Sequence, residues 1–217
     1  HILDFLVRTN KNDKHDEIIT SNILNGLISD ICQFLQIVLF SSMQMRLTVS
    51  FALIRKPFVY NLLIILRLYF TKDFLPKFNN ETSFDTTKLT EDDKLQLLEI
   101  SEQVLISNSI KASDVYNLIF NQKLPDSIIN MSNKALHPST TRNHNNSTKV
   151  QNLNFVFSTS NDKNAQWEYL YSRLPLLLLY LNEVLEFIVF DHLKLENSIY
   201  AERLTERADY LDQNDAC

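Results

Sequence analysis

The chain has 217 residues, of which 45% are hydrophobic and 22% are charged, and its formal net charge is −5. These values are typical of a globular domain and exclude a disordered tail or a coiled-coil rod. The acidic balance does not indicate a nucleic-acid partner, because such proteins bind phosphates through clustered basic residues. The net charge does not exclude a small local site for nucleic acid. Since the first residue is His1 rather than Met, we expect further residues before it.

The sequence contains a single glycine, Gly26. Glycine makes up about 7% of an average protein and serves positive-φ turns, strand bulges and phosphate-binding loops. Long helices joined by connections rich in Asn, Ser and Asp need few such positions, so the scarcity of glycine predicts a mainly α fold. It also excludes the GxGxxG dinucleotide loop, the Walker A loop and the GxSxG nucleophile elbow.

The first part of the chain is predicted to form two long helices. Residues 1–16 combine a short apolar helical segment with a polar loop. From 18 to 43, apolar residues recur at helical spacing and predict an amphipathic helix, with Cys32 as a small core residue. Residues 45–69 predict a second helix that is apolar on nearly all sides and therefore central. Pro57 is expected to kink or interrupt it, because proline removes a backbone donor.

A polar connector over 71–88 separates these helices from three shorter ones. Thr90 followed by Asp93 has the pattern of a capping box and predicts a helix to about Ser107. Two further helices are predicted over 113–120 and from Pro125 to about Leu136. The second part of the chain is therefore expected to be helical as well, apart from one segment.

That segment, 137–164, is rich in Ser, Thr and Asn. Inside it, Leu153, Phe155 and Phe157 alternate with polar or smaller residues, which is the pattern of a β-strand. We therefore expect one small β-hairpin or strand insertion at about 137–160. The last long helix is predicted over 166–195.

Taken together, these elements predict one mainly α domain. The prediction is a single helical bundle over 1–217, with a polar loop or β insertion at 137–164 and a charged C-terminal tail over 196–217.

Two apolar stretches, 51–70 and 174–190, are candidates for membrane-spanning helices. Charged residues and, in the first, a proline interrupt them, whereas a spanning helix needs roughly 20 mostly apolar residues with few charges. We expect both to be buried helices and expect no membrane partner. Cys32 and Cys217 form no disulfide or zinc-site pattern, and no secretory signal is visible. A reducing compartment, the cytoplasm, is therefore predicted.

The segment from His137 to His144 holds the candidate catalytic residues His137, Arg142 and His144. Imidazoles transfer protons near neutral pH, and arginine binds phosphate bidentately, which are functions that an RNase or nucleotidyl-transfer site requires. This interpretation requires the three side chains to face one cleft. The alternative, a mobile polar loop in which these residues are incidental, is the commoner case.

Four other charged residues are candidates for anion or ion-pair contacts. Arg55 and Lys56 lie in an apolar helix, where cations need partners or a pocket, and acidic residues of the last helix are the expected partners. Glu183 and Glu186 lie three positions apart in that helix. They form either an acid–base pair or, more commonly, ion pairs with Arg55 or Arg67.

No residue pattern predicts a metal site or a cofactor. None of the five histidines has an acidic residue three positions before it, and no HExxH motif occurs. We therefore expect neither a metal nor a cofactor.

The segment from Ala52 to Phe58, with Asn61 and Leu62 after it, is similar to a segment of uncharacterised bacterial helical proteins. The same group shows similarity to residues 134–137, to 154–157 and to the helix that contains Trp167. In layout, the chain resembles the HEPN superfamily, whose helical bundles occur in bacterial toxin and phage-defence systems.

Catalytic HEPN proteins carry an arginine, usually followed by a polar residue, and then a histidine after four to six residues. Here Arg142 and Asn143 begin the pattern, but His144 follows too early. Arg8 and His15 have the required spacing in the wrong region of the chain. The resemblance therefore implies a bundle whose usual RNase centre is absent or rebuilt.

These observations favour a non-enzymatic helical interaction module of a bacterial defence, toxin–antitoxin or regulatory system. It would act through a protein partner or as a homo-oligomer such as a dimer. The alternative is a divergent, metal-independent RNase or nucleotide-binding HEPN-like protein that uses His137, Arg142 and His144. A purely structural oligomerisation domain is not distinguished from the first hypothesis by sequence.

Overall fold

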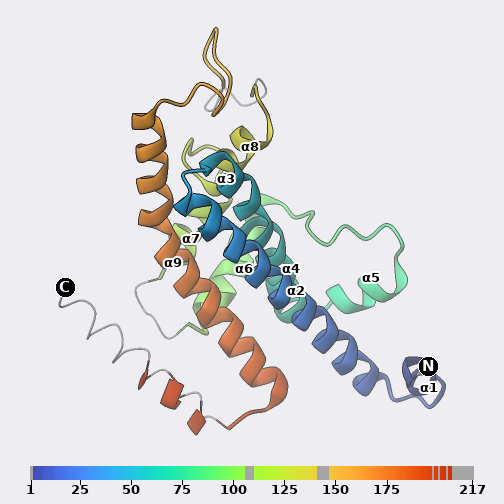
Figure 1. Ribbon diagram of the computed structural model, residues 1–217. Helices are drawn as coiled ribbons and strands as arrows, with labels where there is room; N and C mark the ends of the chain where they lie inside the picture. Colours follow the sequence, from blue (N-terminus) through green and yellow to red (C-terminus); the bar gives the residue numbers. More distant parts are fainter. Residues whose placement is uncertain are drawn as a thin grey trace.

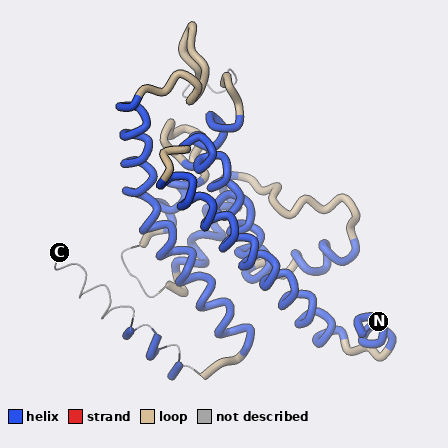
Figure 2. The backbone as a smooth tube through the Cα atoms, viewed as in Figure 1, coloured by secondary structure: helices blue, strands red, loops and turns tan. Residues whose placement is uncertain are grey.

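The computed structural model describes residues 2–105, 110–140, 147–196, 198–199, 201–203 and 205–206 (Figure 1). Within these residues the chain forms nine α-helices and one short π-helix, besides short helical pieces after residue 197. Figure 2 shows the described chain as helices and loops without a strand. The mainly α prediction is therefore confirmed.

The N-terminal part contains helix α1 (Ile2–Arg8) and the 32-residue helix α2 (Asn12–Met43). Helix α2 begins six residues before its predicted start and runs across the front of the molecule in Figure 1. The prediction that Cys32 is a core residue is wrong, because its side chain is exposed. The neighbouring Ile31 is buried instead, so the inward face of α2 passes through 31 rather than 32.

Three consecutive elements form the centre of the protein: α3 (Leu47–Arg55), the π-helix η1 (Lys56–Asn61) and α4 (Leu62–Phe70). They follow one another as a nearly continuous helix that packs against α2, α6 and α8. The central position predicted for 45–69 is confirmed by side chains that are fully buried, namely Phe51, Ile54, Phe58, Leu62, Ile65 and Leu66.

Pro57 lies in the first turn of η1, where the local break that it was predicted to cause takes the form of a π-helical turn. The Leu62 N–H donates to the Pro57 carbonyl five positions earlier, which is the π-helical pattern. Such turns insert one residue into an α-helix and rotate the side chains that follow. Here the rotation brings Asn61 to the α2 side of the helix, as described below.

Four shorter helices follow: α5 (Phe74–Asn80), α6 (Glu91–Glu102), α7 (Ala112–Ile119) and α8 (Ile128–Leu136). Helix α5 lies in the stretch that was predicted to be a connector. The capping box before α6 is confirmed, because the Thr90 hydroxyl accepts from the Asp93 N–H and the Asp93 carboxylate accepts from the Thr90 N–H, each over 3.1 Å. Lys111, rather than Ser113, precedes α7 as its N-cap residue.

Helix α9 (Ser160–Leu193) is the longest described helix and runs down one side of the molecule in Figure 1. It begins six residues before its predicted start, because Thr159 and Asp162 form a second capping box. Most of its predicted apolar face is buried, namely Leu170, Leu174, Leu177, Leu181, Val184 and Ile188. Two residues predicted for that face are not buried: Leu185 is half-buried, and Trp167 remains partly exposed at the N-terminal end.

The predicted β-hairpin or strand insertion at 137–160 is not seen in the described part of that segment, 137–140 and 147–159. Residues 147–159 form turns, and both Gln151 and Phe155 have a φ of 60°, which a strand does not contain. Phe155 packs on the buried ring of Phe51, with centroids 5.6 Å apart, whereas Leu153 and Phe157 are exposed. The alternation in the sequence therefore does not mark the buried face of a strand.

Asn154 holds this turn segment together. Its side-chain amide donates to the His137 carbonyl and to the Thr140 hydroxyl, each over 2.8 Å, and its carbonyl oxygen accepts from the Thr148 hydroxyl. Its backbone N–H donates to the Pro138 carbonyl over 2.8 Å. One asparagine therefore ties the residues after α8 to the residues before α9.

Candidate functional site

The three candidate catalytic residues are only partly within the described structure. His137 follows the last residue of α8, and its side chain is exposed. Arg142 and His144 lie outside the described residues, so whether the three face one cleft stays a prediction. The His137 backbone N–H donates to the Asn133 carbonyl, and the His137 carbonyl accepts from the Asn154 side chain.

Arg55 and Lys56 make contacts other than the predicted ones with the last helix. The Arg55 guanidinium donates to the Tyr60 hydroxyl over 2.8 Å and also to the Asn133 side chain on α8. The Lys56 ammonium lies 3.4 Å from the Asp30 carboxylate of α2 and over the Phe34 ring. Both cations therefore have the partners that charged groups in an apolar helix need. These contacts join the central helix to α8 and α2.

Asp30 is held by two residues of the π-helix. The same carboxylate oxygen that faces Lys56 accepts a hydrogen bond from the Asn61 side chain over 2.7 Å. Asn61 is buried, with 1% of its surface exposed. An amide donor and a cation thus compensate Asp30, which is a partly exposed acid on an otherwise uncharged stretch of α2.

Glu183 and Glu186 occupy different environments on α9. Glu183 is buried, with 3% of its surface exposed, whereas Glu186 lies 3.4 Å from the guanidinium of Arg203. Arg67, a predicted partner, donates instead to the carbonyls of Asp85 and Thr86 over 3.0 and 2.6 Å. Arg67 therefore fastens the 85–86 turn to α4 rather than binding a glutamate of α9.

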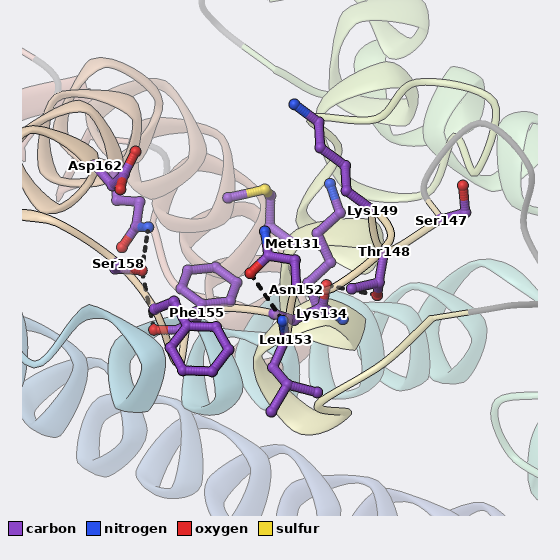
Figure 3. Close-up of a pocket in the computed structure, with 13 residues that line it drawn as sticks. Met131, Lys134, Ser147, Thr148, Lys149, Asn152, Leu153, Phe155, Ser158 and Asp162 are labelled. Carbon is purple, nitrogen blue, oxygen red and sulfur yellow. Dashed lines mark hydrogen bonds between the residues drawn. The ribbon is translucent and has the colours of Figure 1, made fainter.

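A hollow of about 340 Å³ lies between α8, the 147–158 turns and the first turns of α9. Figure 3 shows Met131 and Phe155 at its base, the lysines on one side and Asp162 on the other. Amide and hydroxyl groups complete the lining, which includes Asn152, Ser158 and Gln166. No local sequence pattern predicts this hollow, because its walls come from three separate segments.

The lining carries two cations, Lys134 and Lys149, and one carboxylate, Asp162. Burial lowers the pKa of the Lys134 ammonium, since a partly desolvated cation is less stable than one in water. One oxygen of Asp162 accepts from the Thr159 N–H and from the Thr159 hydroxyl, each over 2.7 Å. These hydrogen bonds lower the pKa of Asp162, so the carboxylate is ionised but bound to the helix cap.

The outer face of α2 is a second feature that the predictions missed. Between Ile18 and Met45, Asp30 is the only charged residue, and it is bound to Lys56 and Asn61. The exposed residues of this stretch that lie within α2 form what we call the α2 stripe: Asn22, Asn25, Gly26, Ser29, Cys32, Gln33, Gln36, Ile37, Phe40 and Met43. Solvent-facing helix surfaces normally carry charged residues, and the α2 stripe has none.

The side chains of the α2 stripe are small or polar at its N-terminal end and bulky and apolar at its C-terminal end. Ile37, Phe40 and Met43 are 48%, 59% and 75% exposed. A Cβ atom built on Gly26 would have no neighbour within 4 Å, so the space beside it is open. The signal was present in the sequence as a 26-residue stretch around a single charge, but helical periodicity alone does not separate an exposed apolar face from a buried one.

Two helical regions of the described chain are long and apolar enough to cross a membrane, Asn12–Met43 and Leu47–Phe70. In the second, 61% of the apolar window is buried inside the protein, as expected of a core helix. In the first, only 17% is buried. Of the two helical regions, α2 is therefore the one whose apolar side chains are left largely uncovered by the rest of the protein.

Among the described residues, no group of three His, Cys, Asp or Glu side chains is arranged to hold a metal ion. Comparisons of the chain with family models, with curated proteins and with solved structures find no match. The chain is therefore an all-helical protein of no recognised family, and its function has to be inferred from its surfaces.

Proposed function

We propose that this protein is a non-enzymatic helical interaction module, and that the α2 stripe is the surface through which it binds a second copy of the same chain. The observation that supports the proposal most directly is an exposed, charge-free helix face about 32 Å long. Protein interfaces are depleted of charged residues at their centre, and large exposed apolar side chains mark such sites.

The spacing of the α2 stripe favours a helix as the binding partner. Seven of its residues repeat at alternating intervals of four and three positions, namely Asn22, Gly26, Ser29, Gln33, Gln36, Phe40 and Met43. This is the seven-residue repeat by which one helix packs along another. A flat membrane surface would instead favour a uniformly apolar face bordered by lysine and arginine, which this stretch lacks.

The two ends of the α2 stripe are complementary, which favours a second copy over an unrelated protein. In a two-fold, antiparallel pair centred on Gln33, Phe40 of one copy faces Gly26 of the other, since each is seven positions from the centre. Likewise, Ile37 faces Ser29. Each bulky side chain then enters open space beside a small residue, and the two Gln33 amides meet at the axis.

Residues near the C-terminal end of α2 extend this surface. Met45, Val49 and Val156 line a second hollow of about 340 Å³, and both valines are exposed. Specific dimers bury more than about 1,000 Å² in total, which is more than a single narrow seam supplies. We therefore place the edge of the interface over these residues.

The assignment to a bacterial defence, toxin–antitoxin or regulatory system is part of the same proposal, and its support is the resemblance of the layout to HEPN bundles. The RNase or nucleotide-binding alternative rests on His137, Arg142 and His144. The exposed position of His137 lends it no support.

Sedimentation equilibrium over a range of protein concentrations tests the proposal. The wild-type chain should reach twice the chain mass, whereas Phe40→Glu should remain at the chain mass, because it places two buried charges in the interface. The matched control is Phe78→Glu, at another partly exposed phenylalanine on α5. It should dimerise like the wild type.

Two results would overturn the proposal. A wild-type chain that stays monomeric at 100 μM would exclude the dimer. Flotation of the wild-type chain with liposomes, lost in Phe40→Glu and retained in Phe78→Glu, would show that the α2 stripe binds lipid rather than protein.

A further inference from the structure

We propose that the hollow between α8, the 147–158 turns and α9 binds a small phosphorylated molecule that carries an aromatic ring, such as a nucleoside monophosphate. This site is distinct from the α2 stripe and does not depend on dimerisation. Three properties support it: two lysines that pair with no carboxylate of the described residues, an apolar wall beside them, and a volume suited to a small ligand.

The first property is the state of Lys134 and Lys149. Neither ammonium group forms an ion pair or hydrogen bond with another described residue, although six other lysines and arginines each pair with a carboxylate. Burial lowers the pKa of the Lys134 ammonium, because a partly desolvated cation is less stable than one in water. A partly buried cation without a partner is unfavourable, and an anion in the hollow would remove that cost.

The position of Lys134 makes it a suitable phosphate ligand. It extends from the last turn of α8, which fixes its base, and Lys149 lies on the turn segment that Asn154 holds in place. Figure 3 shows both side chains on the same side of the hollow. Two ammonium groups on one side can bind two oxygens of a phosphate through charge-assisted hydrogen bonds.

The second property is the apolar wall. Phe155, Phe157 and Met131 line the hollow together with Leu153. Phe157 is 65% exposed and therefore free to stack on a planar ring. The side-chain amides of Asn152 and Gln166 lie on the same lining and can both donate and accept, as recognition of a heterocyclic base requires.

Asp162 opposes anion binding and limits the charge that the site can accept. With one carboxylate and two ammonium groups, the lining carries a net charge of +1, which suits a single phosphate better than a chain of them. One Asp162 oxygen is already bound to Thr159, which reduces its repulsion of a ligand. The volume of about 340 Å³ is at the lower end of the range for ligand pockets, which also favours a monophosphate.

Isothermal titration calorimetry with AMP, inorganic phosphate and adenosine tests this inference on the full chain. AMP should bind at one site per chain and more tightly than either phosphate or adenosine. Lys134→Met and Lys149→Met should each weaken AMP binding about 10-fold or more, because each removes a charge-assisted hydrogen bond. Lys123→Met, at an exposed lysine outside the hollow, should bind AMP within twofold of the wild type.

Circular dichroism tests whether each variant is folded. If Lys134→Met unfolds, Lys149→Met still tests the site, because Lys149 is on an exposed turn. No AMP binding by the wild-type chain at 5 mM would overturn the inference. Equal AMP affinity in Lys149→Met and the wild type would overturn it as well. Equal affinities for phosphate and AMP would overturn the aromatic part of the ligand assignment.

Discussion

The buried side-chain amide of Asn61 donates a hydrogen bond over 2.7 Å to the carboxylate of Asp30, which joins the π-helix to α2. This contact connects the unusual backbone of the central helix with Asp30, the one charged residue between Ile18 and Met45. Without the π-helical turn, the residues after Pro57 would be rotated along the helix, and Asn61 would not face α2 in the same way.

Asn61→Ala is expected to lower the free energy of unfolding by about 1–3 kcal/mol, because it leaves the Asp30 carboxylate without its amide donor. Urea denaturation followed by circular dichroism, at one fixed protein concentration, measures the change. Asn79→Ala, at an exposed asparagine on α5, should change stability by less than about 0.5 kcal/mol. Equal effects of the two substitutions would show that the Asn61–Asp30 hydrogen bond does not stabilise the fold.

Alkaline pH should destabilise the protein through two tyrosines of α9, the buried Tyr180 and the half-buried Tyr169. Burial raises the pKa of Tyr169 to about 12 and also raises that of Tyr180, whose hydroxyl lies 2.6 Å from that of Ser101. In the unfolded chain both titrate near pH 10. Their contribution to stability is therefore complete below pH 10 and is lost as the pH rises from 10 towards 12 and beyond, because the unfolded state releases protons first.

The double variant Tyr169→Phe/Tyr180→Phe should reduce this alkaline loss. The measurement compares urea midpoints at pH 9 and pH 11 for the wild type and the variant. A variant that loses as much stability between these pH values as the wild type would assign the effect to other groups. Tyr171→Phe, a partly exposed tyrosine on the same helix, is the control.

Asn154→Ala should loosen the segment that follows α8 without unfolding the bundle. It removes the side-chain hydrogen bonds to the His137 carbonyl, Thr140 and Thr148, which lie outside the helical core. Hydrogen exchange of the Thr148 amide, which donates to the Thr140 carbonyl, should become faster, while the amides of α4 should keep their protection. Unchanged exchange at Thr148 would show that Asn154 does not hold the segment.

Gly26→Leu is expected to weaken the dimer without lowering the stability of the single chain. Leucine favours a helix over glycine by about 0.8 kcal/mol, and nothing lies within 4 Å of the new Cβ, so the isolated chain should not lose stability. The larger side chain would, however, occupy the space that Phe40 of the second copy is proposed to enter. Sedimentation should therefore show a weaker dimer, with thermal stability of the monomer retained; an unchanged dimer would exclude this packing.

The sequence predicted the helical elements well because their signals are local. The Thr90 capping box and the apolar spacing of α9 depend on residues three or four positions apart, and both are confirmed. The strand signal around Phe155 was misleading, because Phe155 contacts Phe51, more than 100 positions away, while Leu153 and Phe157 are exposed and no common face is buried. The exposure of Cys32 likewise depends on which face of α2 meets the central helix.

The candidate surfaces were harder to predict than the fold. The hollow beside Lys134 is assembled from α8, the 147–158 turns and α9, and its walls come together only through tertiary packing. The sequence indicated that Arg55 needs a partner, but it did not identify the partner. One partner, Tyr60, is five positions away, and the other, Asn133, lies on another helix.

Disulfide cross-linking at position 33 tests the proposed dimer most directly. In a Cys32→Ser/Cys217→Ser background, Gln33→Cys places a thiol at the proposed two-fold axis, within reach of its counterpart on the second copy. We predict a covalent dimer on mild oxidation, whereas Asn79→Cys in the same background should remain a single chain. A Gln33→Cys protein that cross-links no more than Asn79→Cys would contradict the account of α2 as the dimer interface.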